Sequence, residues 1–248
     1  MTAPHRHAWA ALSCIVAAAV ATPAWGGESP AGDPSGAVAP PTTDEVEARR
    51  AFIEERLAAG TFGSNLWWYT WLGLTGAYWA LQVGIASTTD DPDRRTRSVA
   101  SAIKSTLTVT TIALLPNPAR TAQENVEAMD DATPQARAAR LAEGERLLRY
   151  AAVRAKKKTS WLAHTLSATI NALTAAILIY GFDQEVKPVA LSAALGFAAM
   201  EISYLTYPQR PRVDVADYDA RFGPSAPRGV AAWSMVPTAG GTALVVSF

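Results

Sequence analysis

Four long apolar stretches, separated by charged segments, dominate the pattern of hydrophobic and polar positions along this chain. They cover residues 66–86, 98–115, 160–182 and 188–207. Each approaches the roughly 20 residues that a helix needs to cross a hydrocarbon core of about 30 Å. The pattern therefore predicts an all-α protein, a membrane-embedded bundle of about four apolar helices.

Small residues recur at every fourth position within these stretches. Such a row leaves a flat surface on which another helix can pack closely, whereas a soluble core would carry more Leu and Ile there. Aromatic residues near the ends of the stretches fit the level of lipid headgroups. The positions that we expect to pack helices together, within one chain or between copies, are Gly76, Ala80, Gly84, Ala168, Ala172, Ala176 and Gly196.

The chain before the first apolar stretch divides into three segments. Residues 1–26 have the basic start, the apolar run and the small residues of a bacterial-type signal peptide, with an uncleaved anchor as the alternative. Residues 27–41 form a flexible linker rich in Pro and Gly. Thr42 and Glu45 then fit a capping box, which predicts an amphipathic surface helix over residues 42–60.

A polar connection, residues 116–159, interrupts the helical membrane domain that we place at residues 61–207. Thr133 suits the N-cap of a second amphipathic helix because Pro134 follows at its first position. We expect that helix to run to Lys158, with Glu145 and Arg149 paired one turn apart.

The last segment, residues 208–248, changes character. Its prolines predict that long helices are excluded, and the alternating residues near its end predict a C-terminal β-hairpin. Asp214, Asp217 and Asp219 lack the glycine and glutamate of a calcium loop, so they predict a solvated loop. A β-barrel is the minor alternative, because the chain lacks repeated alternating strands.

Composition removes several classes of chemistry. Cleavage after residue 26 would take Cys14 away and leave His164 as the single histidine, so disulfides, thiolate nucleophiles and Cys/His metal sites are not expected. The 22 basic and 22 acidic residues balance, so we expect no nucleic-acid partner. No catalytic motif is recognisable. We therefore expect no cofactor, no metal and no enzymatic activity.

Polar side chains inside the apolar stretches are the candidate functional residues. A charge near the middle of a bilayer costs about 2.5–3.5 kcal/mol, so Lys104 and Glu201 should face a partner or a cavity. An ion pair between these two is one hypothesis, and separate snorkelling toward the headgroups is the other. His164 and Asn171 are further candidates, as hydrogen-bonding residues near the interface and between helices.

The membrane topology stays open at this point. Four crossings after a cleaved signal place the basic connection outside the cytoplasm, against the positive-inside tendency. Three crossings remove the conflict if residues 98–115 do not span, and a soluble, periplasmic or peripheral bundle removes it as well.

The expected function follows from this picture. We expect a non-enzymatic integral membrane protein of the bacterial cell envelope, an interaction or assembly component, in the inner membrane. Its partners would be the lipid bilayer and other envelope proteins or copies of itself. Two alternatives remain: a periplasmic or outer-membrane-associated place, and a small ion- or proton-coupled transporter or channel-like protein using Lys104 and Glu201.

Overall fold

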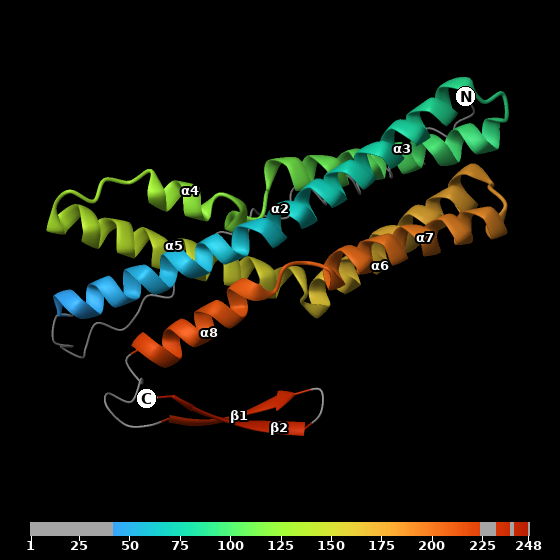
Figure 1. Ribbon diagram of the computed structural model, residues 1–248. Coiled ribbons are helices and arrows are strands. Elements are labelled where there is room, and N and C mark those ends of the chain that lie inside the picture. Colours follow the sequence, from blue (N-terminus) through green and yellow to red (C-terminus); the bar gives the residue numbers. More distant parts are fainter. Residues whose placement is uncertain (1–41, 224–231, 239–240, 248) are drawn as a thin grey trace.

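The structure, a computed structural model, describes residues 42–223, 232–238 and 241–247. The predicted signal peptide and linker lie outside the described residues. The described helices form a bundle with two lobes (Figure 1). The polar lobe contains residues 43–64, 116–158 and 208–222, and the apolar lobe contains residues 65–115 and 159–207.

One helix runs through both lobes. Helix α2 (Thr43–Thr88) has 46 residues and is therefore about 69 Å long at 1.5 Å per residue. The Thr42 side chain accepts a hydrogen bond from the Glu45 amide, so the predicted N-cap is confirmed. The predicted end at Gly60 is wrong, because the helix continues past it without a break.

The polar lobe is built around the first third of α2. Helix α5 (Pro134–Lys158) packs on it, and η1 (Pro118–Arg120), α4 (Ala122–Glu127) and α8 (Arg210–Phe222) close the remaining sides. The N-cap at Thr133 and the end at Lys158 are confirmed. The core of this lobe is apolar and consists of Phe52, Ile53, Leu57, Ala122, Val126, Leu147, Leu148 and Tyr218.

The apolar lobe consists of two helical hairpins that lie side by side (Figure 1). The second half of α2 pairs with α3 (Pro92–Leu114), and α6 (Trp161–Ala176) with its π-helical end η2 (Ile177–Gly181) pairs with α7 (Val186–Leu205). Helix α3 starts earlier than predicted, since Asp91 caps it and accepts from the amides of Asp93 and Arg94.

Tryptophan indoles of α2 donate hydrogen bonds to helices of both hairpins. Trp68 donates to the Ile112 carbonyl at 2.8 Å and Trp79 to the Thr106 hydroxyl at 2.9 Å, which joins α2 to α3. Trp67 donates to the Ser203 carbonyl at 3.1 Å, which joins α2 to α7. These hydrogen bonds join residues that lie far apart in the sequence.

The turn between α6 and α7 is held from the other hairpin. Asp183 adopts φ 51°, a left-handed conformation that Asp tolerates better than most residues. The buried Gln184 accepts from Arg97 and donates to Asp93, both at 2.8 Å and both at the start of α3. The far ends of the two hairpins are therefore joined by side-chain hydrogen bonds.

The fold-class prediction is wrong in two respects. Among the described residues, two helices and not four are long and apolar enough to span a membrane: Trp161–Gly181 and Val186–Phe222, the second running through α7 into α8. Tryptophans and tyrosines make the second half of α2 less hydrophobic than its length suggests, and Lys104 and several threonines do the same for α3. The predicted C-terminal β-hairpin also does not belong to the helical bundle. The backbones of β1 (Ala232–Thr238) and β2 (Gly241–Ser247) pair only with each other, with Ala232 opposite Ser247.

Three crossings are incompatible with the polar lobe. Its core unites residues that precede the α2–α3 hairpin, residues between the hairpins, and residues that follow the α6–α7 hairpin. Each hairpin therefore leaves this lobe and returns to it. Residues 42–223 therefore cross any membrane an even number of times, and all parts of the polar lobe lie on one side of it.

The crossing of α5 over α2 depends on Gly144. A Cβ atom added there would lie 2.8 Å from Ile53 Cγ2, which belongs to a β-branched side chain that cannot easily move away. We expect Gly144→Ala to destabilise the polar lobe by about 1–3 kcal/mol through overpacking. Hydrogen exchange of the α5 amides in the full chain measures this.

Gly63→Ala is the matched control for that substitution. Gly63 also lies inside a helix, but a Cβ atom there meets nothing within 4 Å. The control should be neutral or stabilising by about 0.5–1 kcal/mol, because Ala loses less backbone entropy than Gly on folding. Equal protection of α5 in both variants would contradict the close crossing.

Candidate functional site

The middle of the apolar lobe is lined by small polar side chains. Three serines of α3 and three polar residues of α6 lie on the inward faces of these helices, and the larger buried apolar groups gather at the two ends of the lobe. Ser167, Asn171 and Thr174 follow one another at helical spacing along one face of α6. The buried polar residues of α3, α6 and α7 are Ser98, Ser101, Ser105, Ser167, Asn171, Thr174 and Ser203.

The outside of the same lobe is apolar. Only 22% of the most apolar stretch of α6 with η2 is buried, and only 17% of that of α7, so most of these side chains have no cover from the chain itself. Large apolar residues that are more than half exposed include Leu74, Leu81, Leu191, Leu195, Ile202 and Leu205. The polar lobe follows the opposite arrangement, with an apolar core and a charged exterior.

Two of the four polar candidates meet between α3 and α6. Lys104 Nζ donates to Asn171 Oδ1 at 2.9 Å, and Asn171 Nδ2 donates to the Ser167 carbonyl at 2.9 Å. Helix α7 comes close at this point, since a Cβ atom on Gly196 would lie 2.7 Å from Asn171 Oδ1 and 3.5 Å from Lys104 Nζ. Gly196 thus leaves the space in which the lysine and the amide meet.

The other two candidates form a pair between α6 and α7. His164 Nδ1 lies 2.5 Å from Glu201 Oε2, and the His164 ring stands edge-on to Tyr204 with centroids 5.5 Å apart. Two buried oxygens nearby in the chain, Glu201 Oε1 and Ser167 Oγ, have no hydrogen-bond partner among the described residues. The interior of the lobe thus holds a histidine–carboxylate pair beside unused acceptor atoms.

The hypothesis of an ion pair between Lys104 and Glu201 is wrong. Each charge has a closer partner on α6, where His164 and Asn171 are seven residues, or about two turns, apart on one face. Helix α6 therefore separates the two charges by giving each its own partner. The hypothesis rested on the similar depth of the two residues along their helices. Depth alone does not determine the direction in which each side chain points around its helix.

The predicted helix-packing positions divide into two groups. Gly196 lies at a close contact, as described above. By contrast, added Cβ atoms on Gly76 and Gly84 meet nothing within 4 Å, and Ala80, Ala168 and Ala172 are exposed. Ala176 is half-buried. These rows do not bring helices of this chain together, and packing between copies stays a prediction.

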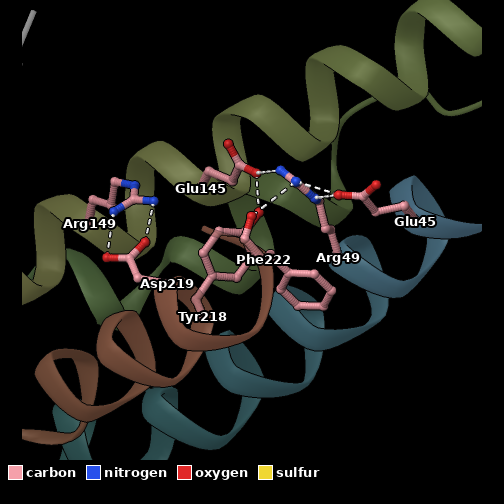
Figure 2. Close-up of polar contacts among 7 residues, drawn as sticks. All are labelled: Glu45, Arg49, Glu145, Arg149, Tyr218, Asp219 and Phe222. Carbon is pink, nitrogen blue, oxygen red and sulfur yellow. Dashed lines mark hydrogen bonds and ion pairs between the residues drawn. The ribbon is translucent and has the colours of Figure 1, made fainter. Parts of the chain in front are cut away.

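A second polar cluster, which sequence reasoning missed, joins three helices of the polar lobe (Figure 2). Arg49 of α2 donates to Glu45 at 2.6 Å and to the Phe222 carbonyl of α8 at 3.1 Å, and it lies 3.8 Å from Glu145 of α5. The Tyr218 hydroxyl donates to the same Glu145 carboxylate.

The predicted pair between Glu145 and Arg149 is wrong, because each of these side chains contacts another helix instead. Arg149 instead binds Asp219 of α8 through two nitrogens, at 2.7 and 3.2 Å, and these hydrogen bonds raise the pKa of Arg149. Both side chains reach across to α8 because that helix lies on α5. The sequence feature that could have predicted these contacts is the row of aspartates in residues 214–219, which offers partners to arginines if the segment is assigned to a helix.

That acidic row is helical and not a solvated loop. Pro211 sits in the first turn of α8, where a proline costs no hydrogen bond, so the prolines of this segment permit a helix of 13 residues. Asp214 is only 2% exposed and lies 3.4 Å from both Arg56 of α2 and Arg210 of its own helix. The carboxylate therefore anchors α8 to α2.

The chemistry open to these sites is limited. Within the described residues, no group of three or more His, Cys, Asp and Glu side chains could hold a metal ion. Ser160, the nearest upstream hydroxyl to His164, already donates to the Lys157 carbonyl at 2.7 Å. The arrangement suits hydrogen bonding and proton exchange between side chains. Comparison with family models, curated proteins and solved structures finds no match to this chain.

Substitution of Gly196 tests the interior contact. We expect Gly196→Ala to push Asn171 away from Lys104 and to lower the stability of the detergent-solubilised full chain by about 1–3 kcal/mol. The measurement is thermal unfolding followed by circular dichroism. Gly84→Ala, at a position with nothing within 4 Å, is the control and should be neutral or slightly stabilising.

A double-mutant cycle shows whether the effect runs through Asn171. Once Asn171→Ala has removed the amide, adding Gly196→Ala should cost little, so the two changes should be non-additive by about 1 kcal/mol or more. Strict additivity would mean that the Gly196 effect arises elsewhere.

Proposed function

We propose that this chain is a non-enzymatic integral membrane protein of a bacterial cell envelope that serves as an interaction or assembly component. In this proposal α6 and α7 cross the inner membrane, α2 and α3 pack against them, and the polar lobe projects on one side. The observation that carries it is the reversal of polarity between the lobes. Water favours apolar cores, whereas a bilayer favours an apolar exterior.

The alternative of a soluble bundle has less support. The core helix of a soluble protein is mostly buried, but α6 and α7 leave about four fifths of their most apolar residues uncovered. Monomeric soluble proteins rarely expose contiguous apolar patches larger than a few hundred Å². Either lipid or another protein must therefore cover the apolar lobe.

An assembly role rests on the polar lobe and not on its amphipathic helices. The apolar faces of α2 and α5 already pack together in the core of that lobe, so they offer no free groove. Its charged exterior and the half-exposed Tyr150 and Val153 of α5 remain for contact with other envelope proteins.

Two exposed aliphatic residues allow a direct test of the membrane proposal. Leu195 in the middle of α7 and Val213 on α8 are 63% and 58% exposed. Arginine at Leu195 should cost about 2.5–3.5 kcal/mol on membrane insertion, whereas arginine at Val213 faces water and should cost nearly nothing. The measurement is the amount of full chain in the inner-membrane fraction that resists extraction with alkaline carbonate.

Leu195→Arg should therefore deplete that fraction several-fold, and Val213→Arg should leave it unchanged. In a water-soluble protein, arginine at either exposed position would be tolerated within about 0.5 kcal/mol. Equal recovery of both variants, or wild-type chain that carbonate removes from the membrane, would contradict the proposal.

The second candidate function is ion or proton coupling through the interior polar residues. The specific observation in its favour is the His164–Glu201 pair beside two buried oxygens without a partner, Glu201 Oε1 and Ser167 Oγ. Buried polar groups are normally satisfied, so unused ones point to a water, an ion or a proton in transit. Lys104 lies on the same interior surface.

Replacement of Glu201 separates the two functions. A coupled transporter predicts proton or cation flux into proteoliposomes, measured with an enclosed pH- or ion-sensitive dye, that Glu201→Gln abolishes while the chain stays folded. An assembly component predicts no flux above empty liposomes for either protein. Glu185→Gln, at the exposed α6–α7 turn, is the control and should keep any flux that the wild type shows.

A further inference from the structure

Cations at the junction of the two lobes differ from most arginines of the polar lobe. Seven arginines of the polar lobe form ion pairs with carboxylates of the chain: Arg49, Arg50, Arg56, Arg140, Arg146, Arg149 and Arg210. Three cations where the lobes meet, Arg120, Arg154 and Lys158, form no such pair within the described residues. We refer to these three as the junction cations.

Aromatic rings and a backbone carbonyl hold the junction cations in place. The Arg120 guanidinium stacks on Trp68 with its carbon 3.6 Å from the ring centre, and its Nε donates to Asn65 at 2.8 Å. Lys158 Nζ lies 5.1 Å from the ring centre of Tyr204. Their positions are thus fixed by groups that leave each positive charge uncompensated.

Arg154 and Lys158 are one turn apart at the end of α5. Arg154 donates to the Leu115 carbonyl at 3.1 Å, at the end of α3, so its side chain bridges the two lobes. Burial, together with the neighbouring charge of Arg154, lowers the pKa of Lys158 to about 8. An anion bound beside these two residues would offset both effects, because an opposite charge favours the protonated lysine.

The level of the junction identifies the kind of anion. Trp67 and Tyr207 pack together there, and the exposed Trp161 begins α6 three residues after Lys158, the last residue of α5. Tryptophan and tyrosine favour the headgroup layer of a bilayer. Basic residues next to a membrane helix attract anionic lipids.

We propose that the junction cations bind the phosphate headgroups of anionic phospholipids. Guanidinium groups match phosphate oxygens with two parallel hydrogen bonds, and the lysine adds a point charge. The acyl chains of the same lipids would lie along the exposed apolar residues of α6 and α7. This inference rests on the proposed membrane location of the apolar lobe and adds a lipid class to it.

A general electrostatic attraction does not account for such binding. The chain has 22 basic and 22 acidic residues, so its net charge provides no field toward anions. Selectivity for anionic lipid must therefore come from local cations without carboxylate partners. The test therefore compares variants that lose the same number of positive charges at different positions.

Brominated lipids provide the test, because bromine quenches tryptophan fluorescence on contact. The full chain is reconstituted in nanodiscs with brominated phosphatidylglycerol or brominated phosphatidylcholine in an otherwise zwitterionic bilayer. We expect wild-type protein to prefer the anionic lipid by about fivefold or more, since one basic residue near a membrane surface contributes about that factor. The triple variant R120Q/R154Q/K158Q should show a preference near one.

A control variant removes the same total charge elsewhere. Arg137, Arg146 and Arg221 lie on the polar lobe outside the junction, and R137Q/R146Q/R221Q should keep the wild-type preference. Lys158→Gln alone, which removes no hydrogen bond that the structure describes, should lower the preference partly and serves if the triple variant does not fold. Inorganic phosphate in the buffer should leave the preference unchanged.

Each other outcome overturns the inference in a different way. Equal loss in the junction and control variants would show an effect of net charge, and no preference in the wild type would show no site. Loss of the preference on addition of inorganic phosphate would show a site for a soluble anion. No quenching by either lipid would show that the apolar lobe does not contact lipid, in which case the proposed function fails as well.

Discussion

The continuity of α2 is the constraint on which the rest of the structure depends. A single helix of 46 residues contributes Ile53 to the core of the polar lobe and Trp67 to the contact with α7, so the two lobes share one axis. Gly144 lets α5 cross this helix closely at one end. The α6–α7 hairpin is then confined between two fixed points, the α5–α6 connection and the Gln184 contact with α3.

The burial of large apolar residues changes along the length of the same helix. Phe52, Ile53 and Leu57 are buried in the polar lobe, whereas Leu74 and Leu81 further along are more than half exposed. A helix in one solvent shows one consistent apolar face. Apolar residues that are buried in one part of an unbroken helix and exposed in another indicate that the environment of the helix changes along its axis. The change occurs near Trp67 and Trp68, the level at which the unpaired cations Arg120 and Lys158 also lie.

Local signals in the sequence predicted local structure well. The N-caps at Thr42 and Thr133 each need only a side chain and an amide three residues on, so the sequence specifies them. The end of a helix at Gly60 was wrong because glycine lowers helix stability by only about 1 kcal/mol, less than packing on both sides provides. Pro211 misled in the opposite sense, since a proline in the first turn starts a helix as readily as it ends one.

The four candidate residues show where such reasoning stops. Their types and depths were visible in the sequence, but their pairing depends on how α6 is rotated between α3 and α7. With His164 and Asn171 on one face, α6 supplies a partner to Glu201 on one neighbour and to Lys104 on the other. A polar group inside the lobe that loses its hydrogen-bond partner costs free energy, so these two contacts favour one rotation of α6 in the lobe. That rotation places Leu166 and Leu173 outward, where they are exposed, and gives the lobe its apolar surface.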